Sequence, residues 1–310
     1  MIPKIDAQAL FDADKEALDA VRRAAETTGF MTLHNTALSG AEVAAVIESY
    51  RQFFKLPEAA KEPVDMAQTG SNRGWGRAGS EQVDPNANPD YKQFFDCGVS
   101  VPREHPWADK QFYAPNKWPE QPAGLGAADF RADVLAYFTK ARAISMDLLS
   151  ALARAIGEPA SFFEDKFDTP MALLRGNYYP ERPAWAGAKD FGIATHTDYG
   201  CLTFLALDGS PGLEVRQRGG GWIPVRAEPG TFVINFGEMF EMWTNGRVKA
   251  TPHRVVGGTN ERISIPLFFN PNYDTNVAPI GSGQVILAGE HLSARYNETY
   301  VHLQQTSKGG

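Results

Sequence analysis

Apolar positions in the first half of the chain recur at the three- and four-residue spacing of amphipathic helices. Residues 7–28 follow this pattern, with charged residues between the apolar ones. A second helix is expected to begin after Ser39, a residue type that caps helices, and to end near Pro57. A third, longer helix is expected over residues 129–156. The N-terminal part is therefore predicted to be mainly helical, with one short strand at residues 30–33.

After Pro170 the pattern changes to short apolar or alternating runs that are separated by glycine-rich turns. Residues 218–221 lie between two such runs, as the turn of a hairpin would. Many short strands with frequent turns predict a mainly β fold with flanking helices and a jelly-roll or barrel core. A last helix is expected at about 292–303. The expected strands are residues 171–174, 201–207, 213–215, 222–225, 231–235, 253–256 and 263–269.

Residues 65–125 show little periodicity and are rich in Gly, Pro, Asn and Asp. They are expected to form loops, one strand near residues 91–98 and part of a pocket wall. The chain is therefore divided into an N-terminal region with helices and pocket loops, residues 1–125, and a region with the long helix and the jelly roll, residues 126–310. The two regions are expected to form one compact unit.

Composition narrows the choice of partners and location. The chain has 310 residues, 43% of them apolar, and a net charge of −7 without a basic block, which argues against nucleic acid as the main partner. No apolar stretch approaches the length of a membrane span, and the N-terminus has no apolar region typical of a signal peptide. Cys97 and Cys201 form no CxxC pair. A reducing cytoplasm is the expected location.

The sequence His196-Thr197-Asp198, followed far downstream by His253, contains candidate metal ligands. Two imidazoles and one carboxylate can bind one face of an octahedral metal and leave three positions open, which is the facial triad of non-haem Fe(II) oxygenases. In a strand, residues two apart project to the same side, so His196 and Asp198 are expected to point together. A His-x-Asp sequence alone is common and usually marks a hydrogen-bonded pair in a loop. The residues that follow favour the metal site.

Arg262 and Ser264 are also two apart, at the start of an apolar run. Together they offer a guanidinium fork and a hydroxyl to the far end of a dicarboxylic cosubstrate. The alternative is a surface salt bridge worth under about 1 kcal/mol. The apolar character of the strand favours the anion site.

Five segments resemble the Fe(II)/2-oxoglutarate-dependent dioxygenases of the isopenicillin N synthase-like group, which includes plant flavonoid and gibberellin oxygenases. The resemblance is nearly end to end, and it implies a double-stranded β-helix (jelly roll) with Fe(II) near its mouth and 2-oxoglutarate and O2 as cosubstrates. The segments are Phe53-Phe54-Lys55-Leu56-Pro57, Asn177-Tyr178-Tyr179-Pro180, residues 196–203, residues 245–247 with 253–255, and residues 261–264 with the end at 268–271.

The resemblance also implies roles for further residues. Asn177 and Tyr179 correspond to residues that help to bind 2-oxoglutarate, and Phe268 to a position that packs on the substrate. Trp75, in the glycine-rich loop 72–76, is a further candidate for a substrate contact, although an aromatic residue there can simply cover the barrel. A tyrosine or phenylalanine on a strand is otherwise a packing residue.

Two departures from the group's pattern leave the triad intact. Thr36-Ala37 stand where the group usually has His-Gly, and Gly237-Glu238 stand where Gly-Asp is usual. The first lies in a scaffold turn. It bears only on how close the chain is to the plant enzymes.

The function expected from these residues is oxidation of a small molecule by hydroxylation, desaturation or ring chemistry, with 2-oxoglutarate converted to succinate and CO2. One alternative is an oxidase of the same fold that does not use 2-oxoglutarate, like isopenicillin N synthase or aminocyclopropane carboxylate oxidase. Another is a metal-binding jelly roll without turnover. A metal-dependent hydrolase would need a base such as Glu238 beside the site, and no motif supports it.

Overall fold

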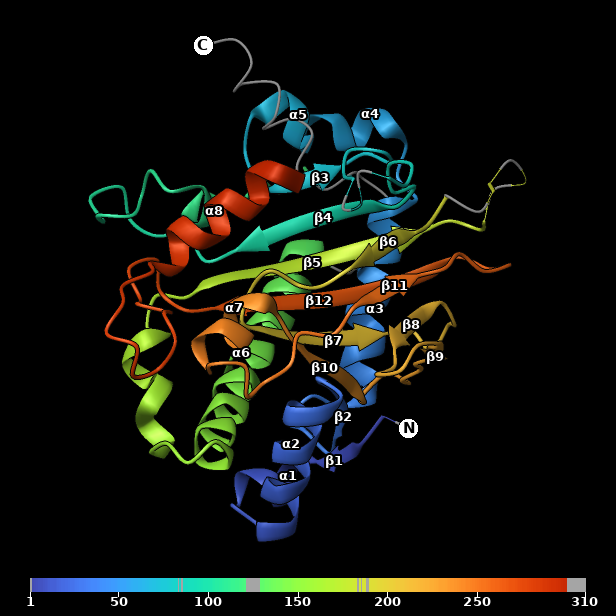
Figure 1. The fold of residues 1–310 in the computed structure, drawn as a ribbon. Helices are drawn as coiled ribbons and strands as arrows, with labels where there is room; N and C mark the ends of the chain where they lie inside the picture. Colours follow the sequence, from blue (N-terminus) through green and yellow to red (C-terminus); the bar gives the residue numbers. More distant parts are fainter. Residues whose placement is uncertain are drawn as a thin grey trace.

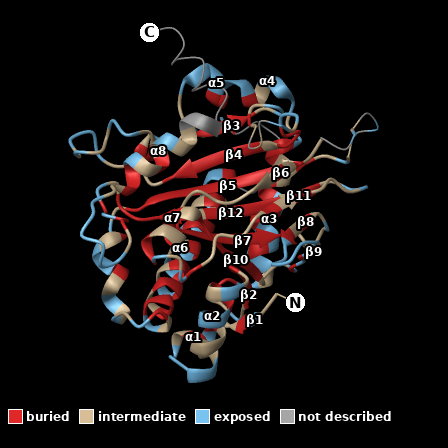
Figure 2. Cartoon of the chain, viewed as in Figure 1, coloured by how far each residue is buried: buried red, intermediate tan, exposed pale blue. Residues whose placement is uncertain are grey.

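The structure is a computed structural model that describes residues 2–82, 84, 86–120, 129–182, 184, 186–187 and 190–299. Two β-sheets form its centre, and the helices α3 (Gly40–Phe54) and α6 (Phe130–Ala155) cover the outer face of the larger sheet (Figure 1). Buried residues are concentrated in the strands and on the inner faces of these helices (Figure 2). The sheets, rather than the helices, therefore enclose the interior in which a site can form.

The larger sheet has eight strands in the order β1-β2-β10-β7-β12-β5-β4-β3. Its neighbours pair antiparallel, except β1 and β2, which pair parallel. Strands from the first and second parts of the chain thus share one sheet. The strands are β1 Lys4–Asp6, β2 Phe30–His34, β3 Gly74–Gly76, β4 Gln93–Gly98, β5 Met171–Tyr179, β7 Leu202–Leu207, β10 Phe232–Phe236 and β12 Arg262–Asn270.

The smaller sheet has four strands in the order β6-β11-β8-β9. Side chains from both sheets face a common cavity, so the predicted mainly β, double-sheet jelly-roll core is confirmed. The predicted boundary between residues 125 and 126 lies outside the described residues, and the division into two regions stays a prediction. The strands are β6 Ile193–His196, β8 Leu213–Arg216, β9 Trp222–Pro224 and β11 His253–Val255.

The helical predictions are confirmed where a capping residue marks the start. Ser39 caps α3 in a reciprocal capping box with Glu42, and Asp129 caps α6. The remaining helices are α1 Ala7–Phe11, α2 Lys15–Thr27, α4 Glu58–Lys61, α5 Met66–Thr69, α7 Glu238–Trp243 and α8 Ala288–Thr299, with 3-10 turns at Glu62–Val64, Gln111–Tyr113 and Ala160–Lys166.

The single helix predicted over residues 7–28 is wrong, because the chain breaks between α1 and α2. Ala13 has a φ of 61°, outside the helical range, and the side chain of Asp14 accepts a hydrogen bond from the backbone of Ala17 to start a new helix. The apolar spacing continues across the break, so periodicity alone cannot detect it. The last helix, α8, begins earlier than residue 292, and the expected continuation over residues 300–303 lies outside the described residues.

All seven strands predicted after Pro170 are present, within a few residues of their expected bounds. The largest difference is in β5, which continues past Leu174 to Tyr179. Its second half carries Arg175 and Asn177, polar residues that are nevertheless buried, and their polarity hid the strand from an apolar pattern. No helix among the described residues is long and apolar enough to cross a membrane.

Candidate metal and cosubstrate site

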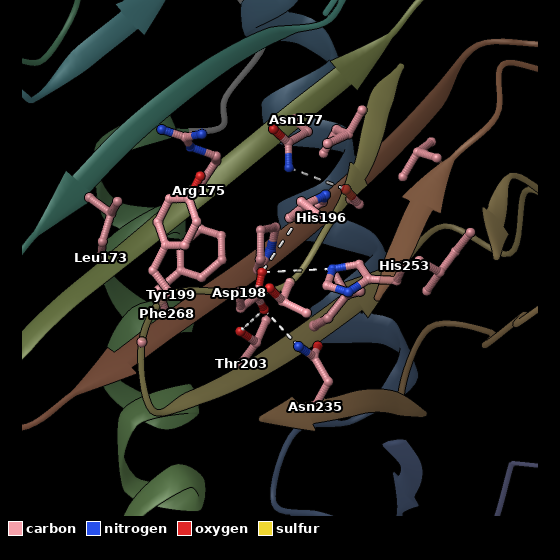
Figure 3. A pocket seen from close by; sticks show the side chains of 18 of the residues that line it. Leu173, Arg175, Asn177, His196, Asp198, Tyr199, Thr203, Asn235, His253 and Phe268 are labelled. Carbon is pink, nitrogen blue, oxygen red and sulfur yellow. Dashed lines mark hydrogen bonds and ion pairs between the residues drawn. The ribbon is translucent and has the colours of Figure 1, made fainter. Parts of the chain in front are cut away.

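A cavity of about 130 Å³ lies between the two sheets and receives most of the side chains that the sequence singled out (Figure 3). The three candidate metal ligands and residues of the Arg262 strand all contribute to its lining. Further lining residues include Leu173, Arg175, Tyr199, Phe268, Leu292 and Tyr296. The jelly roll thus gathers residues from positions 81 to 296 around one interior space.

His196, Asp198 and His253 come together as predicted. His196 ends β6 and lies directly opposite His253, the first residue of β11, in the register of the smaller sheet. The Nε2 atoms of both histidines lie 3.7 Å from Oδ1 of Asp198, and one ligand atom from each residue fits within 4.8 Å of the others. Asp198 lies beyond the end of β6 rather than on it, so the prediction that both ligands of the His-x-Asp segment are carried by a strand is wrong in this detail.

The backbone near Asp198 turns tightly against a neighbouring strand. Asn270 of β12 accepts a hydrogen bond from the backbone of Cys201 (2.8 Å). Gly200 makes this approach possible, because a Cβ atom there would lie 2.0 Å from Oδ1 of Asn270. The turn is therefore fixed by contacts outside the metal ligands themselves.

Hydrogen bonds orient each ligand toward a common point. Nδ1 of His196 lies 2.8 Å from the carbonyl oxygen of Ala194, and Nδ1 of His253 lies 3.1 Å from that of Thr251. A ring that donates from Nδ1 to a carbonyl keeps its lone pair on Nε2, the atom that faces Asp198. The backbone thus selects the tautomer that can bind a metal.

Asp198 is held in the same way. Its Oδ2 accepts hydrogen bonds from Nδ2 of Asn235 (2.6 Å) and Oγ1 of Thr203 (2.5 Å), which leaves Oδ1 directed at the histidines. Neither partner was predicted from the sequence. The available signal was an isolated polar residue within each of two otherwise apolar strands, β7 and β10, because a buried polar side chain needs a partner.

Burial sets the charge of the ligands. Burial lowers the pKa of His253 to about 4, with a further lowering by His196 and an opposing effect of Asp198. Burial raises the pKa of Asp198, but the two histidines and the hydrogen bonds from Thr203 and Asn235 outweigh it and hold this pKa below its usual value. Neutral His253 and ionised Asp198 are the forms that ligate metals. The donor set therefore fits a divalent cation with open coordination positions, as Fe(II) requires.

The second cluster lies on adjacent strands beside the triad. Arg262 and Ser264 of β12 pair directly with Tyr179 and Asn177 of β5, and all four side chains are buried. Nδ2 of Asn177 lies 3.4 Å from Oγ of Ser264, and the Arg262 guanidinium lies 4.8 Å from the Tyr179 ring centre. The structure thus confirms that these residues are neighbours.

Arg262 has polar atoms that the described part of the protein does not satisfy. Its Nε and Nη1, together with Oδ1 of Asn177, are buried and lack a hydrogen-bond partner among the described residues. An unpaired buried guanidinium is costly, so Arg262 is a candidate partner for an anionic ligand. A carboxylate matches its fork geometry.

The two candidate substrate residues differ in position. Phe268 lines the cavity, as does Tyr199 (Figure 3). Trp75 is not among the described residues that line it. Its indole lies on edge strand β3, where Nε1 donates to Gln93 (3.0 Å) and the charged groups of Lys61 and Arg77 each lie 4.8 Å from the ring. Trp75 therefore packs at the sheet edge.

A buried charge network that was not predicted from the sequence forms another part of the cavity wall. Arg175 donates to both carboxylate oxygens of Asp96 (2.7 Å each) and to Glu81 (2.8 Å), and Lys92 also bonds Glu81. Burial raises the pKa of Glu81, but Arg175 and Lys92 outweigh it and lower this pKa to about 2. Glu81, Lys92 and Asp96 come from the segment with least periodicity and Arg175 from β5, so only folding brings them together.

Comparison with known proteins agrees with this geometry. Residues 2–121 match the family described as non-haem dioxygenase in morphine synthesis N-terminal, and residues 170–271 match the 2OG-Fe(II) oxygenase superfamily. A 2-oxoglutarate-dependent dioxygenase of Didymella fabae is 32% identical over 303 residues, which cover 93% of this chain and 91% of that protein. The chain therefore belongs to the 2-oxoglutarate–Fe(II) oxygenases.

Two solved structures extend the comparison. A full-length Neurospora crassa protein in complex with alpha-KG and thymine has a TM-score of 0.81 and 26% identity, covering 98% of this chain and 97% of that one. JOX2 in complex with 2OG, Fe and JA has a TM-score of 0.74 and 26% identity, covering 90% and 78%. The expected enzyme class, an Fe(II)- and 2-oxoglutarate-dependent dioxygenase, is confirmed together with its cofactors. This outcome favours it over an oxidase that does not use 2-oxoglutarate.

Proposed function

We propose that this chain oxidises a small molecule beside an Fe(II) ion held by His196, Asp198 and His253. When bound, the iron and 2-oxoglutarate supply the oxidising chemistry, in which O2 is consumed and 2-oxoglutarate is converted to succinate and CO2. The chain's own contribution is to hold the ligand atoms Nε2, Oδ1 and Nε2 in place and to keep the centre out of bulk water. The hydrogen bonds to Ala194, Thr251, Thr203 and Asn235 support this assignment.

We assign the 2-oxoglutarate site to the β5–β12 pair. Arg262 would donate its two unpaired N–H groups to the distal carboxylate, with the hydroxyl of Ser264 beside it. Asn177 and Tyr179 would form the wall of the same site. The observation that carries the proposal is this buried, partly unpaired guanidinium in the same cavity as the triad.

The substrate would bind between the triad and the aromatic wall of the cavity. Phe268, Tyr199 and Leu173 all line the cavity, and two rings with an aliphatic side chain suit a small molecule with a flat apolar part. Binding of thymine by the structurally similar Neurospora crassa protein supports a substrate of this size. The three oxidation outcomes, hydroxylation, desaturation and ring chemistry, all use the same metal ligands and so remain equal candidates.

We also propose a cytoplasmic location, because the two cysteines form no disulfide with each other. Cys97 and Cys201 are both buried and free in the structure. Buried thiols without a disulfide are typical of a reducing compartment. Fractionation of cells of the native host, with detection by an antibody against this protein, would check the location. Recovery of the protein outside the cytoplasmic fraction would contradict it.

The test of the assigned sites is anaerobic addition of Fe(II) and then 2-oxoglutarate, followed by visible absorption. Chelation of the iron by 2-oxoglutarate should give a weak charge-transfer band in the native protein. His253→Ala should abolish the band through loss of iron, and Arg262→Met should shift its appearance to higher 2-oxoglutarate concentration. Iron binding without any band would refute the cosubstrate assignment and revive the 2-oxoglutarate-independent oxidase.

A further inference from the structure

Helix α8 forms part of the wall on the substrate side of the cavity. Leu292 and Tyr296 point from this helix into the lining, whereas the triad lies on the β6–β11 side. Figure 1 shows α8 beside the β4 end of the larger sheet, far along the chain from the metal ligands. The shape of the substrate side therefore depends on how α8 is seated.

Arg295 fixes α8 to the segment that carries the metal ligands. Its Nη2 donates to Oε2 of Glu238 (2.8 Å), and its guanidinium lies 4.6 Å from the ring centre of Tyr199, the residue after Asp198. One arginine thus contacts both α7 and the turn that follows the His-x-Asp segment. An isolated surface ion pair, by contrast, would join only two side chains and contribute little to stability.

Glu238 continues the connection to the ligands. Its other oxygen, Oε1, accepts a hydrogen bond from Oγ1 of Thr197, the residue between His196 and Asp198. Its backbone N–H donates to the carbonyl oxygen of Asp198 (2.8 Å). Glu238 is therefore bonded to the ligand segment through side chain and backbone, and to α8 through Arg295.

The length of Glu238 matters for this arrangement. Two carboxylate oxygens serve two partners on different elements, and the side chain must span from α7 to both. An aspartate, which the resembling group usually has here, is one methylene shorter. The departure noted in the sequence thus coincides with a contact between α8 and the ligand segment.

We propose that Arg295 and Glu238 are positioning residues that couple the seating of α8, and so the shape of the substrate side, to occupation of the metal site. The path runs from α8 through Arg295 and Glu238 to Thr197, which is held between two ligands. Because coupling between two sites is reciprocal, a metal that orders the ligand segment should also stabilise α8. This inference rests on the metal site proposed above.

The test is amide hydrogen exchange of residues 288–299 with and without Mn(II), in the absence of O2 and substrate. Binding of Mn(II) is followed separately by its electron paramagnetic resonance signal. In the native protein Mn(II) should slow exchange in α8 roughly fivefold, the low end of usual coupling factors. Arg295→Met keeps the aliphatic stem but loses the charge, and the slowing should disappear. Glu238→Asp should also abolish the slowing. The double variant of Arg295→Met with Glu238→Asp should show no larger change than either single variant.

Two further variants separate coupling from a general loss of stability. Glu290→Gln changes an exposed carboxylate on the same helix and should leave the Mn(II)-dependent slowing intact. Arg295→Lys should restore part of it. If Mn(II) binds and α8 is slowed equally in the native protein and in Arg295→Met, the inference is overturned while the metal site stands. If Mn(II) does not bind the native protein, the proposed metal site itself fails, and the inference falls with it.

Discussion

At the scale of single residues, the proposed chemistry depends on buried polar side chains. Arg262 illustrates this, since two of its nitrogen atoms lack a partner among the described residues while the side chain is 3% exposed. Keeping such a group inside the protein is tolerable only when a ligand completes its hydrogen bonds. We therefore expect Arg262 to affect cosubstrate affinity more than the affinity for iron.

Arg262→Met should weaken 2-oxoglutarate binding about a hundredfold, because loss of one partner of a buried charge pair costs about 2–5 kcal/mol. The dissociation constant can be measured by anaerobic titration of the charge-transfer band, with Fe(II) affinity measured in parallel. Arg22→Met, which breaks an exposed ion pair with Asp19 on α2, is the matched control and should change neither value. Equal loss of iron and 2-oxoglutarate affinity would contradict the assignment.

The side chains that hold Asp198 should tune metal affinity. Asn235→Ala removes a 2.6 Å hydrogen bond to Oδ2 and should reduce Mn(II) affinity about 10- to 100-fold, the usual effect of losing a group that orients a ligand. Thr203→Val should act similarly, and Thr203→Ser, which keeps the hydroxyl, should not. Unchanged affinity in both Asn235→Ala and Thr203→Val would show that the two hydrogen bonds do not position Asp198.

At the scale of elements, strands β4 and β5 are joined by charge as well as by backbone pairing. Arg175 of β5 bonds Asp96 of β4 and also Glu81 from the preceding loop, all of them buried. Glu81 also accepts a hydrogen bond from Lys92, so these contacts hold its loop against the cavity wall. The network thus stabilises the cavity wall.

Glu81→Gln should lower the free energy of unfolding at pH 7 by about 3 kcal/mol, because it leaves buried cations without their shared anion. The pKa of Glu81 is lowered from 4.5 to about 2 in the folded protein, so its stabilising effect is complete above about pH 4.5 and is lost as the pH falls toward 2. The difference between native protein and variant should therefore shrink over that window. Urea unfolding at pH 7 and pH 3 checks this.

The matched control for this prediction is Glu48→Gln on α3. Glu48 is exposed and pairs with Arg51 at 2.7 Å, a type of contact worth little in water. Its loss should change stability by less than about 1 kcal/mol at either pH. A Glu81 variant that behaves like the Glu48 variant would mean that the network adds no stability.

The helices and strands also show which features of the fold can be predicted from the sequence. Helical apolar spacing, with a capping residue for α3, predicted α3 and α6, and short apolar or alternating runs predicted seven of the eight described strands after Pro170, because these signals are local; β6 was not predicted. The break at Ala13 escaped detection because the apolar spacing runs through it. The triad and the Arg262 pair could be singled out because their spacing and residue types are those that metal and carboxylate binding need, and the structure brings each set together. Asn235 and Glu81 were not, since their roles arise from neighbours far away in sequence.

At the scale of the whole molecule, the metal should stabilise the fold, since its ligands come from both strands of the β6–β11 pair and the turn after β6. A ligand that binds only the folded state stabilises it by about 2.7 kcal/mol at 100 times its dissociation constant. For a chain of this size the Tm should rise by roughly 5 °C on adding Mn(II), and EDTA should reverse the rise. Calorimetry checks this, and His253→Ala should show no Mn(II)-dependent shift. A rise of equal size in that variant would place the ion elsewhere.

The pairing of His253 with His196 has a consequence for how the chain assembles. Strand β11 has only three residues, and His253 and Val255 on its buried face set its register together with the backbone bonds. A slip by one position would set Pro252 or Arg254 opposite His196, and neither can bind a metal. An ion present during folding would therefore stabilise the native register alone. The metal ion would then select against wrong strand pairing during folding. Protein refolded with metal should therefore contain fewer chains with β11 out of register than protein refolded without it.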